Sequence, residues 1–547
     1  MKVLFLVNLP SPYRALFFAE LGKLCDLTVI YERESASDRN ERWKVQTENT
    51  YRAIYLSGLR IGADNSFCPE IIKYLRNEKY DKYVVGMYST YTAMLAIEYL
   101  KRHKLSFFLS TDGGFIQKDS FFKYIIKKHF IGSATSWLCP SNKAIEYFVH
   151  YGAKREKTYK YPFTSLLEKD ITESVTISQA EKKELREKYG IKESKVLLSI
   201  SDGSDDSIYC GGILETAEKY KEDVGIYILA ETPKKKLLEY IKEKKLLNVH
   251  CIDSKNKRDL AEYFALSDGG IIINPNDSIK EYVGMAMTFG LPIISNQKNL
   301  GDMEIVNHGV NGLLVDSGDE DFVTKAIQAL FSDMDSFHAM SIESRKMVDC
   351  YSISYMDYSN LQFFKDYCKN RIGVKEEVAL LAVGQFIPRK GFDILLEAAC
   401  EMPKNIGIYI VGGKPSQEYI DYVKKNNLEQ IHFVDFMSKE ELKYYYLAAD
   451  VFVHPTREDI WGLVINEAIG YRLPIITTER CLAGVELVKD GINGFSVPVD
   501  DAKSLAEAIM KVLSDNPVAM GINSYQVAKN YTIEQMALRH YEIFQKG

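Results

Sequence analysis

An internal repeat constrains the fold of this chain more than any other feature of its sequence. Residues 454–478 are followed by a Gly-Ile-Asn-Gly turn at 491–494, and a related segment at 274–295 is followed by a Gly-Val-Asn-Gly turn at 309–312. An offset of about 182 residues aligns the ends of the two segments and their turns. A segment written twice at one spacing predicts two domains of the same architecture.

The two copies differ in their charged residues. Glu467 of the later copy falls opposite Met285 of the earlier one. Upstream, a strand-to-helix turn of the later copy carries Arg389 and Lys390, whereas the matching stretch at 199–212 has three aspartates and no cation. A helix N-terminus with nearby cations suits a diphosphate, which the aspartates would repel. The sequence therefore predicts that the later copy carries the chemistry and that the earlier copy is a degenerate donor-type domain.

Short apolar strands alternate with amphipathic helices along the chain, which predicts parallel sheets in an α/β fold with Rossmann-like domains. The pattern gives three domains at 1–165, 166–372 and 373–547, with boundaries in the charged stretch around 168–193 and the polar stretch around 350–376. The expected strands are 3–7, 27–31, 83–85 and 106–110 in the first domain, 196–201, 225–229, 249–252, 270–273 and 292–295 in the second, and 378–383, 407–411, 431–434, 451–454 and 474–477 in the third.

Composition and cysteine spacing indicate an ordinary soluble protein of the reducing cytosol. The chain is 46% hydrophobic and 26% charged, and its nine cysteines include no close pair. This spacing argues against a zinc knuckle or a disulfide framework. The apolar start is too short for a signal peptide or a membrane span and is expected to form the first strand.

Charge is distributed unevenly over a chain with a net charge of −6. Residues 1–165 carry 25 lysines and arginines against 16 acidic residues. A basic first domain favours an anionic partner such as a membrane surface or a phosphorylated acceptor. Nucleic acid is not expected, because no stripe of basic and aromatic residues accompanies the excess. Chance unevenness between domains is the alternative.

A pair of acids in the later copy forms the candidate site. Asp459 and Glu467 are eight residues apart and flank Trp461-Gly462-Leu463. If a helix begins near Gly462, its free amides face the same pocket as Asp459. Amides and cations could hold the diphosphate of a nucleotide-sugar, and carboxylates could bind ribose and sugar hydroxyls. A solvated loop acid and a surface glutamate are the alternative, which the joint loss of acid and cations in the earlier copy disfavours.

These motifs carry a family resemblance. Residues 376–530 resemble the donor-binding half of retaining glycosyltransferases of family 4, which have the GT-B fold of two facing Rossmann-like domains. Residues 383–393 resemble that family's G-x5-K-G turn, and residues 459–467 resemble its E-x7-E motif, with an aspartate in the first position. Glu458 is adjacent, so the register is open by one residue. The first domain resembles the acceptor half more weakly, through residues 8–14, 110–116 and 159–165.

The resemblance implies roles for individual residues. Arg389 and Lys390 would hold the diphosphate and stabilise the leaving group, Glu467 would bind the ribose, and Asp459 would bind a donor-sugar hydroxyl. Nearby negative charge would stabilise an oxocarbenium-like transition state. Cations would neutralise the departing diphosphate, as a metal ion does in other enzymes. The implied enzyme therefore uses no metal and no cofactor beyond its nucleotide-sugar substrate. Further donor contacts are implied for Gly384, Gly462, Leu463 and Val464.

Two loops of the first domain are candidates for the acceptor side. Many members of the family place a histidine after the fourth strand, where this chain has Asp112. Asp112 could replace that histidine near the anomeric carbon, or it could be a plain turn residue. Pro12, Tyr13 and Arg14 follow the first strand and are expected to face the cleft, unless they serve turn geometry.

A basic amphipathic helix is expected at 119–132. Its apolar residues gather near one face and its lysines lie largely off that face. Such a helix can lie on an anionic bilayer, or it can pack on the core with a solvated edge. The residues concerned are Phe122, Ile125, Ile126 and Phe130 on the apolar side and Lys123, Lys127 and Lys128 beside it.

The expected function is that of a metal-independent retaining glycosyltransferase. It would move a sugar from a nucleotide-sugar to a glycan or lipid-linked acceptor in surface polysaccharide assembly, in the cytoplasm or at the inner face of the membrane. A pseudo-transferase scaffold and a GT-B sugar-nucleotide epimerase or phosphorylase are the alternatives. The third domain is expected to face the first, with a C-terminal helix at 533–545 crossing back; a swapped dimer would be the other solution.

Overall fold

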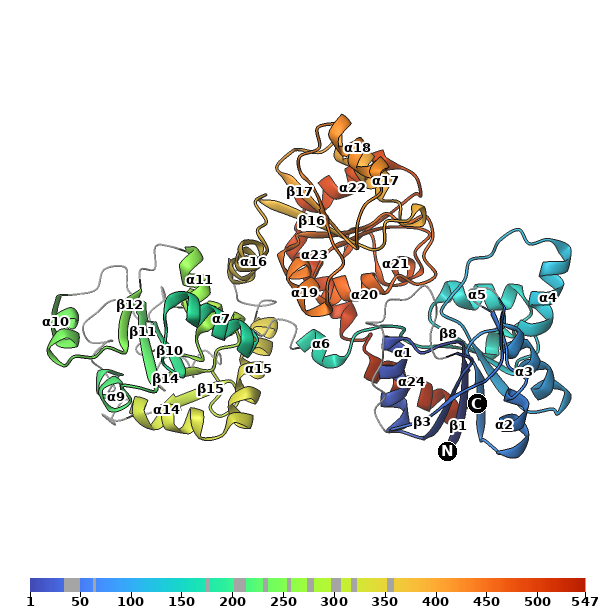
Figure 1. The fold of residues 1–547 in the computed structure, drawn as a ribbon, viewed down its shortest axis with the longest axis horizontal. Helices are drawn as coiled ribbons and strands as arrows, with labels where there is room; N and C mark the ends of the chain where they lie inside the picture. The colour runs from blue at the N-terminus through green and yellow to red at the C-terminus, as the bar shows by residue number, and fades with distance from the viewer. Residues whose placement is uncertain are drawn as a thin grey trace. The chain divides into compact units, whose positions relative to one another are not determined.

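Three parallel β-sheets with flanking helices make up the fold (Figure 1). The sheets contain seven, six and six strands in chain order. They confirm the α/β, Rossmann-like fold class that the alternation of strands and helices predicted. The computed structural model describes residues 1–33, 50–61, 65–172, 177–200, 213–229, 235–252, 257–272, 280–296, 306–315, 322–351 and 359–546.

The first sheet has the strand order β3-β2-β1-β6-β7-β8-β9. Its strands are β1 (Lys2–Val7), β2 (Asp26–Tyr31), β3 (Arg52–Tyr55), β6 (Lys82–Val85), β7 (Phe107–Ser110), β8 (Ser136–Cys139) and β9 (Thr158–Lys160). Its helices are α1 (Pro12–Gly22), α2 (Ile71–Asn77), α3 (Tyr91–Arg102), α4 (Phe121–Ile131), α5 (Asn142–His150), the 3-10 turn η2 (Arg155–Lys157) and α6 (Glu168–Thr172). A separate antiparallel pair is formed by β4 (Leu59–Ile61) and β5 (Asn65–Phe67).

The middle sheet has the order β12-β11-β10-β13-β14-β15. Its strands are β10 (Lys195–Ile200), β11 (Val224–Leu229), β12 (Val249–Ile252), β13 (Gly269–Ile272), β14 (Ile293–Asn296) and β15 (Gly312–Val315). Its helices are α7 (Gln179–Tyr189), α9 (Ile213–Lys219), α10 (Lys235–Glu243), α11 (Lys257–Leu266), α12 (Lys280–Thr288), α14 (Phe322–Ser332), α15 (Met334–Tyr351) and α16 (Ser359–Ile372).

The third sheet repeats that order as β18-β17-β16-β19-β20-β21. Its strands are β16 (Val378–Val383), β17 (Ile406–Val411), β18 (Ile431–Val434), β19 (Val451–His454), β20 (Ile475–Thr478) and β21 (Gly494–Val497). The helices between and after these strands in the chain are η5 (Pro388–Lys390), α17 (Phe392–Ala399), α18 (Gln417–Lys425), α19 (Lys439–Ala448), α20 (Leu463–Gly470), α21 (Leu482–Leu487), α22 (Ala502–Ser514), α23 (Pro517–Ala528) and α24 (Ile533–Lys546).

The strands expected from the sequence all form, with ends shifted by at most one residue. They are readable because both faces of a parallel sheet are covered by helices, so a strand is a continuous apolar run. The six residues of β11 and the six of β17 are buried throughout. The strands that were not predicted are β3, β4, β5, β8, β9, β15 and β21.

The described chain divides into two compact units. One consists of residues 1–171, 376–438 and 450–547, and the other of residues 172–375 and 439–449. The first and third sheets thus share a unit, which is the arrangement that the sequence favoured. The exact limits of the three domains stay predictions.

The stretches expected as boundaries contain helices that belong to the second unit. Leu185 of α7 and Phe363 of α16 lie in the core around the middle sheet. Helix α19 joins them, because Tyr367 of α16 donates a hydrogen bond to the buried Glu181 carboxylate at 2.7 Å and Tyr444 of α19 donates another. A charged composition in the first stretch and a polar one in the second indicated domain boundaries, yet one apolar face is enough to pack a helix against a core.

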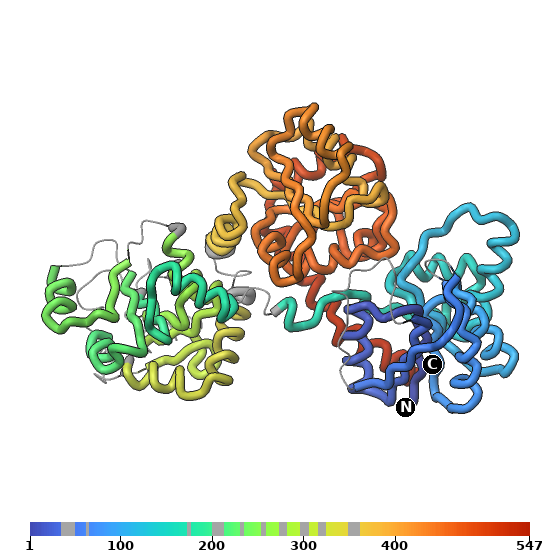
Figure 2. Tube along the Cα trace, in the orientation of Figure 1, coloured from blue at the N-terminus to red at the C-terminus, as the bar shows by residue number. Residues whose placement is uncertain are grey.

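The C-terminal helix α24 packs on α1 in the first unit, as expected from the sequence (Figures 1 and 2). The imidazole ring of His540 lies 4.7 Å from the ring of Phe17 and 4.3 Å from that of Tyr161. Burial lowers the pKa of His540 to about 4. The helix therefore closes the aromatic core of the first sheet with a neutral histidine.

No helix among the described residues combines the length and the apolar character that crossing a bilayer requires.

Candidate functional site

An ion pair at the carboxyl ends of β16 and β19 is the centre of the site. Lys390 Nζ lies 2.6 Å from Asp459 Oδ2, and both side chains are only 13% exposed. Lys390 is the last residue of η5, which follows β16, and Asp459 lies in the loop after β19. Parallel neighbouring strands deliver these loops to the same sheet edge, so two residues predicted from separate motifs meet there.

Arg457 and its loop hold η5 in place. The Arg457 guanidinium donates hydrogen bonds to the Pro388 carbonyl at 2.6 Å and to both oxygens of Asp393 at 3.0 and 2.7 Å. Its backbone N–H donates to the Arg389 carbonyl at 2.8 Å. These bonds fix the direction in which Lys390 leaves the turn.

Arg389 and the adjacent acid Glu458 occupy the rim. Arg389 Nη1 lies 3.7 Å from Asp459 Oδ1 and donates to the Glu458 carbonyl at 3.1 Å. The Glu458 carboxylate pairs with Arg480 instead of Lys390. The neighbouring acid that left the register open therefore faces a different cation, and Asp459 is the acid beside Lys390.

Two glycines permit close backbone approach at this edge. A Cβ on Gly391 would lie 2.0 Å from the Pro455 carbonyl oxygen, and one on Gly462 would lie 2.7 Å from Cys481 Sγ. Both residues also have a positive φ, 67° and 95° respectively, which L side chains rarely adopt. The turn that presents Lys390 and the turn that opens α20 both need glycine.

Helix α20 begins at Leu463, one residue after the start expected from the sequence. Gly462 is its N-cap, so the amides of Leu463 and Val464 are at the end that carries partial positive charge. Glu467 lies in the second turn of the helix and is partly buried. Gly384 directly follows β16, and its N–H donates to the Val411 carbonyl at 2.9 Å.

A buried histidine completes the cluster and was not predicted. The last residue of β19 is His454, whose side chain is fully buried and whose Nε2 lies 3.2 Å from Asp459 Oδ2. Burial lowers the pKa of His454, so we assign a neutral ring that donates from Nε2. Burial opposes ionisation of Asp459, but His454 and Lys390 hold the pKa of this carboxyl below its usual range. The signal was available in the sequence as a polar residue ending an apolar strand.

The first-domain candidates also come together. Arg14 Nη2 donates to Asp112 Oδ2 at 2.6 Å, and Tyr13 Oη donates to the same oxygen at 3.2 Å. Arg14 Nη1 donates to Asn8 Oδ1 at 3.1 Å. Pro12 starts α1 and supplies no side-chain hydrogen bond of its own. Asp112 is thus bound to two of the residues that were predicted for the acceptor side.

Direct contacts join this cluster to the third sheet. The ring of Phe163 lies 5.5 Å from that of Tyr13 and 5.2 Å from that of Trp461. Asn466 of α20 donates to the Phe163 carbonyl at 3.2 Å. At Gly113, a Cβ would come within 2.6 Å of the Ile460 carbonyl oxygen. The Asp112 loop therefore abuts the loop that carries Asp459.

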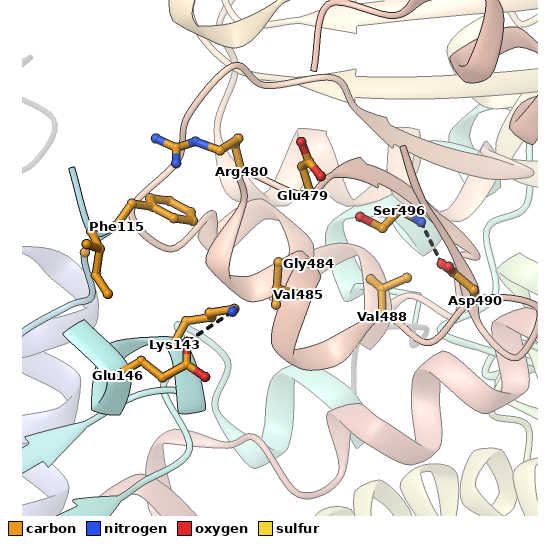
Figure 3. A pocket seen from close by; sticks show the side chains of 12 residues that line it. Phe115, Lys143, Glu146, Glu479, Arg480, Gly484, Val485, Val488, Asp490 and Ser496 are labelled. Atoms are coloured by element: carbon orange, nitrogen blue, oxygen red, sulfur yellow. Dashed lines mark hydrogen bonds and ion pairs between the residues drawn. The ribbon is translucent and has the colours of Figure 1, made fainter. Parts of the chain in front are cut away.

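A pocket of about 690 Å³ opens beside these loops (Figure 3). Phe115 and the α5 residues Lys143 and Glu146 lie on one side, and Arg480 with Val485 of α21 lies on the other. Arg480 connects the pocket to the site, because its carbonyl accepts the N–H of Asp459 at 2.9 Å. The remaining lining residues are Gly114, Ile116, Glu479, Gly484, Val488, Asp490 and Ser496.

Helix α4 exposes its apolar residues. Phe121 and Phe122 are 72% and 78% exposed, and Ile125 and Ile126 are 45% and 50% exposed. Only Ile131 of this helix is buried. Phe130, by contrast, is partly buried and packs against the core of the first sheet. Core packing, the alternative that the sequence left open, therefore holds for Phe130 alone among the four apolar residues predicted for this face.

The middle copy lacks the polar residues at two positions that the structure describes. Met285 of α12, opposite Glu467, is buried in the apolar core. Ile272 ends β13 at the position where His454 ends β19, and it is fully buried. The three aspartates at 202, 205 and 206 lie outside the described residues.

No group of three or more histidine, cysteine, aspartate or glutamate side chains is placed to hold a metal ion in the described part of the chain. Metal independence stays a prediction.

Comparison with known proteins gives two matches to one family. Residues 181–347 and residues 368–534 each match the model described as Glycosyl transferases group 1. The two matches together cover more than half of the chain and correspond to the two copies of the repeat.

Curated relatives resemble about a third of the chain or less. An uncharacterized glycosyltransferase of Methanocaldococcus jannaschii is 27% identical over 168 residues, which are 30% of this chain and 47% of the relative. The lipopolysaccharide glucosyltransferase WaaG of Escherichia coli is 25% identical over 162 residues, or 28% and 43% of the two chains. A GDP-mannose-dependent phosphatidylinositol monomannoside mannosyltransferase of Mycolicibacterium smegmatis is 29% identical over 168 residues, or 28% and 44%. The chain spans less than half the length of these relatives.

Proposed function

The chain belongs to the glycosyl transferases group 1 family, and we propose that it transfers a sugar from a nucleotide-sugar donor to a glycan or lipid-linked acceptor. The observation that carries this proposal is the buried Lys390–Asp459 pair at the N-terminal end of α20. A cation, a helix N-terminus and a carboxylate in one recess match the diphosphate and the hydroxyls of such a donor.

Each group of the site has a task in this proposal. Lys390 and Arg389 neutralise the diphosphate as it leaves, and the α20 amides add hydrogen bonds to its oxygens. Asp459 binds a hydroxyl of the donor sugar. Glu467, farther along the helix, binds the ribose.

The acceptor hydroxyl reaches the sugar from the first domain. Asp112 lies in the loop that abuts Ile460, next to Asp459. Its pairing with Arg14 at 2.6 Å orients the carboxyl group, which we place near the anomeric carbon. The finer assignments, a retaining outcome, membership of family 4 and freedom from metal, belong to this proposal.

The relatives support an acceptor of the cell envelope. One is named for glucosyl transfer in lipopolysaccharide and another for mannosyl transfer to a phosphatidylinositol mannoside. We extend this chemistry to the present chain as surface-polysaccharide assembly at a membrane. The face of α4 supports it, because four large apolar residues are exposed beside Lys123 and Lys128.

A donor screen with the full chain tests the transfer reaction. Uridine, guanosine and adenosine diphosphate sugars would be offered with lipid-linked acceptors, and products would be detected by mass spectrometry. A sugar-acceptor adduct is expected from one nucleotide class. Epimerised donor or sugar phosphate without an adduct would favour the epimerase or phosphorylase alternative, and no reaction with no nucleotide binding would favour the scaffold.

Vesicle sedimentation tests the membrane contact. The wild type is expected to bind vesicles that contain phosphatidylglycerol and not to bind vesicles made only of phosphatidylcholine, because lysines flank the apolar face. The double variant F121S/F122S should lose at least ten-fold in binding. The control L59S/L247S removes two exposed leucines elsewhere, which are 70% and 86% exposed, and should bind normally. Equal loss in both double variants would refute a specific role for α4.

A further inference from the structure

Two pockets of the first unit meet at Ile116. This residue lines the pocket beside Arg480 and also a second pocket of about 630 Å³ next to α4. The segment 114–119 therefore runs from the candidate site to the start of the exposed helix. The second pocket is lined by Ile116, Gln117, Lys118, Asp119, Phe121, Tyr124 and His150.

The second pocket offers basic groups in an apolar surround. Lys118 and His150 are exposed at its wall, whereas Phe121, Tyr124 and Ile116 supply carbon surface. Asp119 does not cancel the charge of Lys118, because its carboxylate lies 2.8 Å from Lys127 Nζ and its side chain is only 2% exposed. Lys123 makes a second ion pair with it at 3.2 Å. An anionic group with an apolar attachment fits this lining.

The apolar attachment has a path out of the pocket along α4. Phe121 lines the pocket and is followed on the helix by the exposed side chains of Phe122, Ile125 and Ile126. Lys128 is exposed on the same helix. A chain that leaves the pocket along this face would stay on carbon surface and reach the region proposed to lie on the bilayer.

The other pocket has the chemistry of a saccharide site. Sugar hydroxyls could bind to the carboxylates of Glu146, Glu479 and Asp490. Lys143 Nζ lies 3.1 Å from the Glu146 carboxylate and can donate hydrogen bonds to the same hydroxyls. Val485 adds carbon surface for a sugar ring (Figure 3). The volume of this pocket, about 690 Å³, lies in the range of small-molecule sites, which is about 300 to 1,000 Å³.

We infer that the acceptor is a saccharide joined through a phosphate to a lipid, and that it lies along residues 114–119. The phosphate binds at Lys118 and His150, the lipid follows α4, and the saccharide enters the pocket beside Arg480, where it meets the donor sugar. This inference rests on the proposed function, since it names the acceptor of that reaction.

Calorimetric titration of the full chain with dodecyl phosphate, below its micelle concentration, tests the phosphate end. Wild type is expected to bind it, and K118Q/H150Q should bind at least ten-fold more weakly. The control H103Q/K104Q removes an exposed histidine–lysine pair at the end of α3 and should leave the affinity unchanged. Unchanged affinity in K118Q/H150Q would overturn the inference.

Two comparison ligands identify what the site recognises. Inorganic phosphate should bind at least ten-fold more weakly than dodecyl phosphate, because it lacks the apolar part. Dodecyl maltoside should do so as well, because it lacks the anion. Equal binding of either would reduce the pocket to a free-phosphate site or a bare apolar surface and overturn the inference.

The saccharide end is tested by filling its pocket. V485W should lower transfer at least ten-fold through a higher acceptor KM, with dodecyl phosphate binding intact. The control M510W adds the same ring at a residue of matched exposure, 37% against 38%, on α22, and should transfer normally. Normal transfer in V485W would overturn this part of the inference.

Titration with uridine and guanosine diphosphate separates this inference from the proposed function. If neither nucleotide binds the wild type, the proposed donor site is contradicted, whether or not dodecyl phosphate binds. If a nucleotide binds and is lost in K390A while K118Q/H150Q keeps its dodecyl phosphate affinity, only the acceptor inference fails.

Discussion

The middle and third sheets show one scaffold with and without its polar site. Both have six parallel strands in the same order, and five of the six strand pairs keep an offset of 182 residues. The turn before the last strand is the same in both: Gly309 and Gly491 have φ of 77° and 74°. Their N–H groups donate to the carbonyls of Gly312 and Gly494 at 2.8 and 3.0 Å.

The difference lies at the carboxyl ends of the strands. His454 ends β19 and contacts Asp459, whereas Ile272 ends β13 and is fully buried. Glu467 of α20 is partly buried, whereas Met285 of α12 lies in the core. Residues that shape the turn are shared because the sheet requires them, and residues that bind ligand are free to change once binding is no longer selected. A repeat motif therefore marks function only where its polar members remain.

Removing the central cation should have the largest effect. In the proposed reaction Lys390 neutralises the leaving diphosphate, so we expect Lys390→Ala to lower transfer about 100- to 1,000-fold. Product formation measured by mass spectrometry checks this. The control K503A removes a lysine whose side chain is 75% exposed and should be normal.

A thermal melt must accompany that assay, because Asp459 loses its closest cation in K390A. Full transfer by a folded K390A would contradict the assignment of the site. If K390A loses both transfer and folding, Lys390→Arg provides the test instead. This variant keeps the positive charge and should retain more activity than K390A.

Exchanging Met285 and Glu467, which occupy matched helix positions in the two copies, should lower stability in one copy and nucleotide binding in the other. Met285→Glu buries a carboxylate in the middle core and should destabilise that unit by roughly 3 kcal/mol. Glu467→Met should leave folding intact and abolish nucleotide binding instead. The control M334E places the same acid at a residue that is 58% exposed and should change stability by less than about 0.5 kcal/mol. Denaturant unfolding measures these changes. If M285E were as stable as wild type, the assignment of Met285 to the middle core would be wrong.

Acid should weaken the first unit through its buried histidines. His540 has a pKa of about 4 because of burial, so below its ordinary value of about 6.5 the unfolded chain binds the proton first. Stability is therefore complete above about pH 6.5 and falls as pH drops toward 4, by roughly 3 kcal/mol at most for this residue. His540→Phe should flatten the pH profile measured by denaturant unfolding, and the exposed control H103F should not. An unchanged slope in H540F would disprove the linkage.

Replacing His454 by the residue of the middle copy should have the smallest effect on catalysis. His454→Ile removes one hydrogen bond to Asp459 and leaves Lys390 in place, so nucleotide affinity should fall about ten-fold. The control H432I changes a histidine of β18 that pairs with Glu376 at 2.7 Å, away from the site. Calorimetry of both variants would refute a role for His454 if their affinities were equal.

The scaffold could be predicted from sequence because its determinants are local. Apolar runs defined the strands, and Gly462 marked the start of α20. The repeat then predicted two domains of the same architecture, which the shared strand order of the second and third sheets bears out. The pairing of Lys390 with Asp459 was also within reach, because strand ends of a parallel sheet converge.

Long-range partners were not predictable in the same way. Arg480 follows β20 and lies outside the motifs that the sequence singled out. His454 is the first residue of the repeat at 454–478, but nothing in the local sequence indicates its contact with Asp459. Helix α4 shows a different difficulty. Its pattern of phenylalanines, isoleucines and lysines fits a core helix or a surface helix equally, and only the neighbours in space decide between them.

We propose that the third sheet alone carries the donor site. Calorimetric titration of the full chain with uridine, guanosine and adenosine diphosphate tests it most directly. One nucleotide should bind with a stoichiometry of one, and this binding should vanish in K390A and persist in M334E. Two sites per chain, or undiminished binding in K390A, would place a working site in the middle copy and contradict the account.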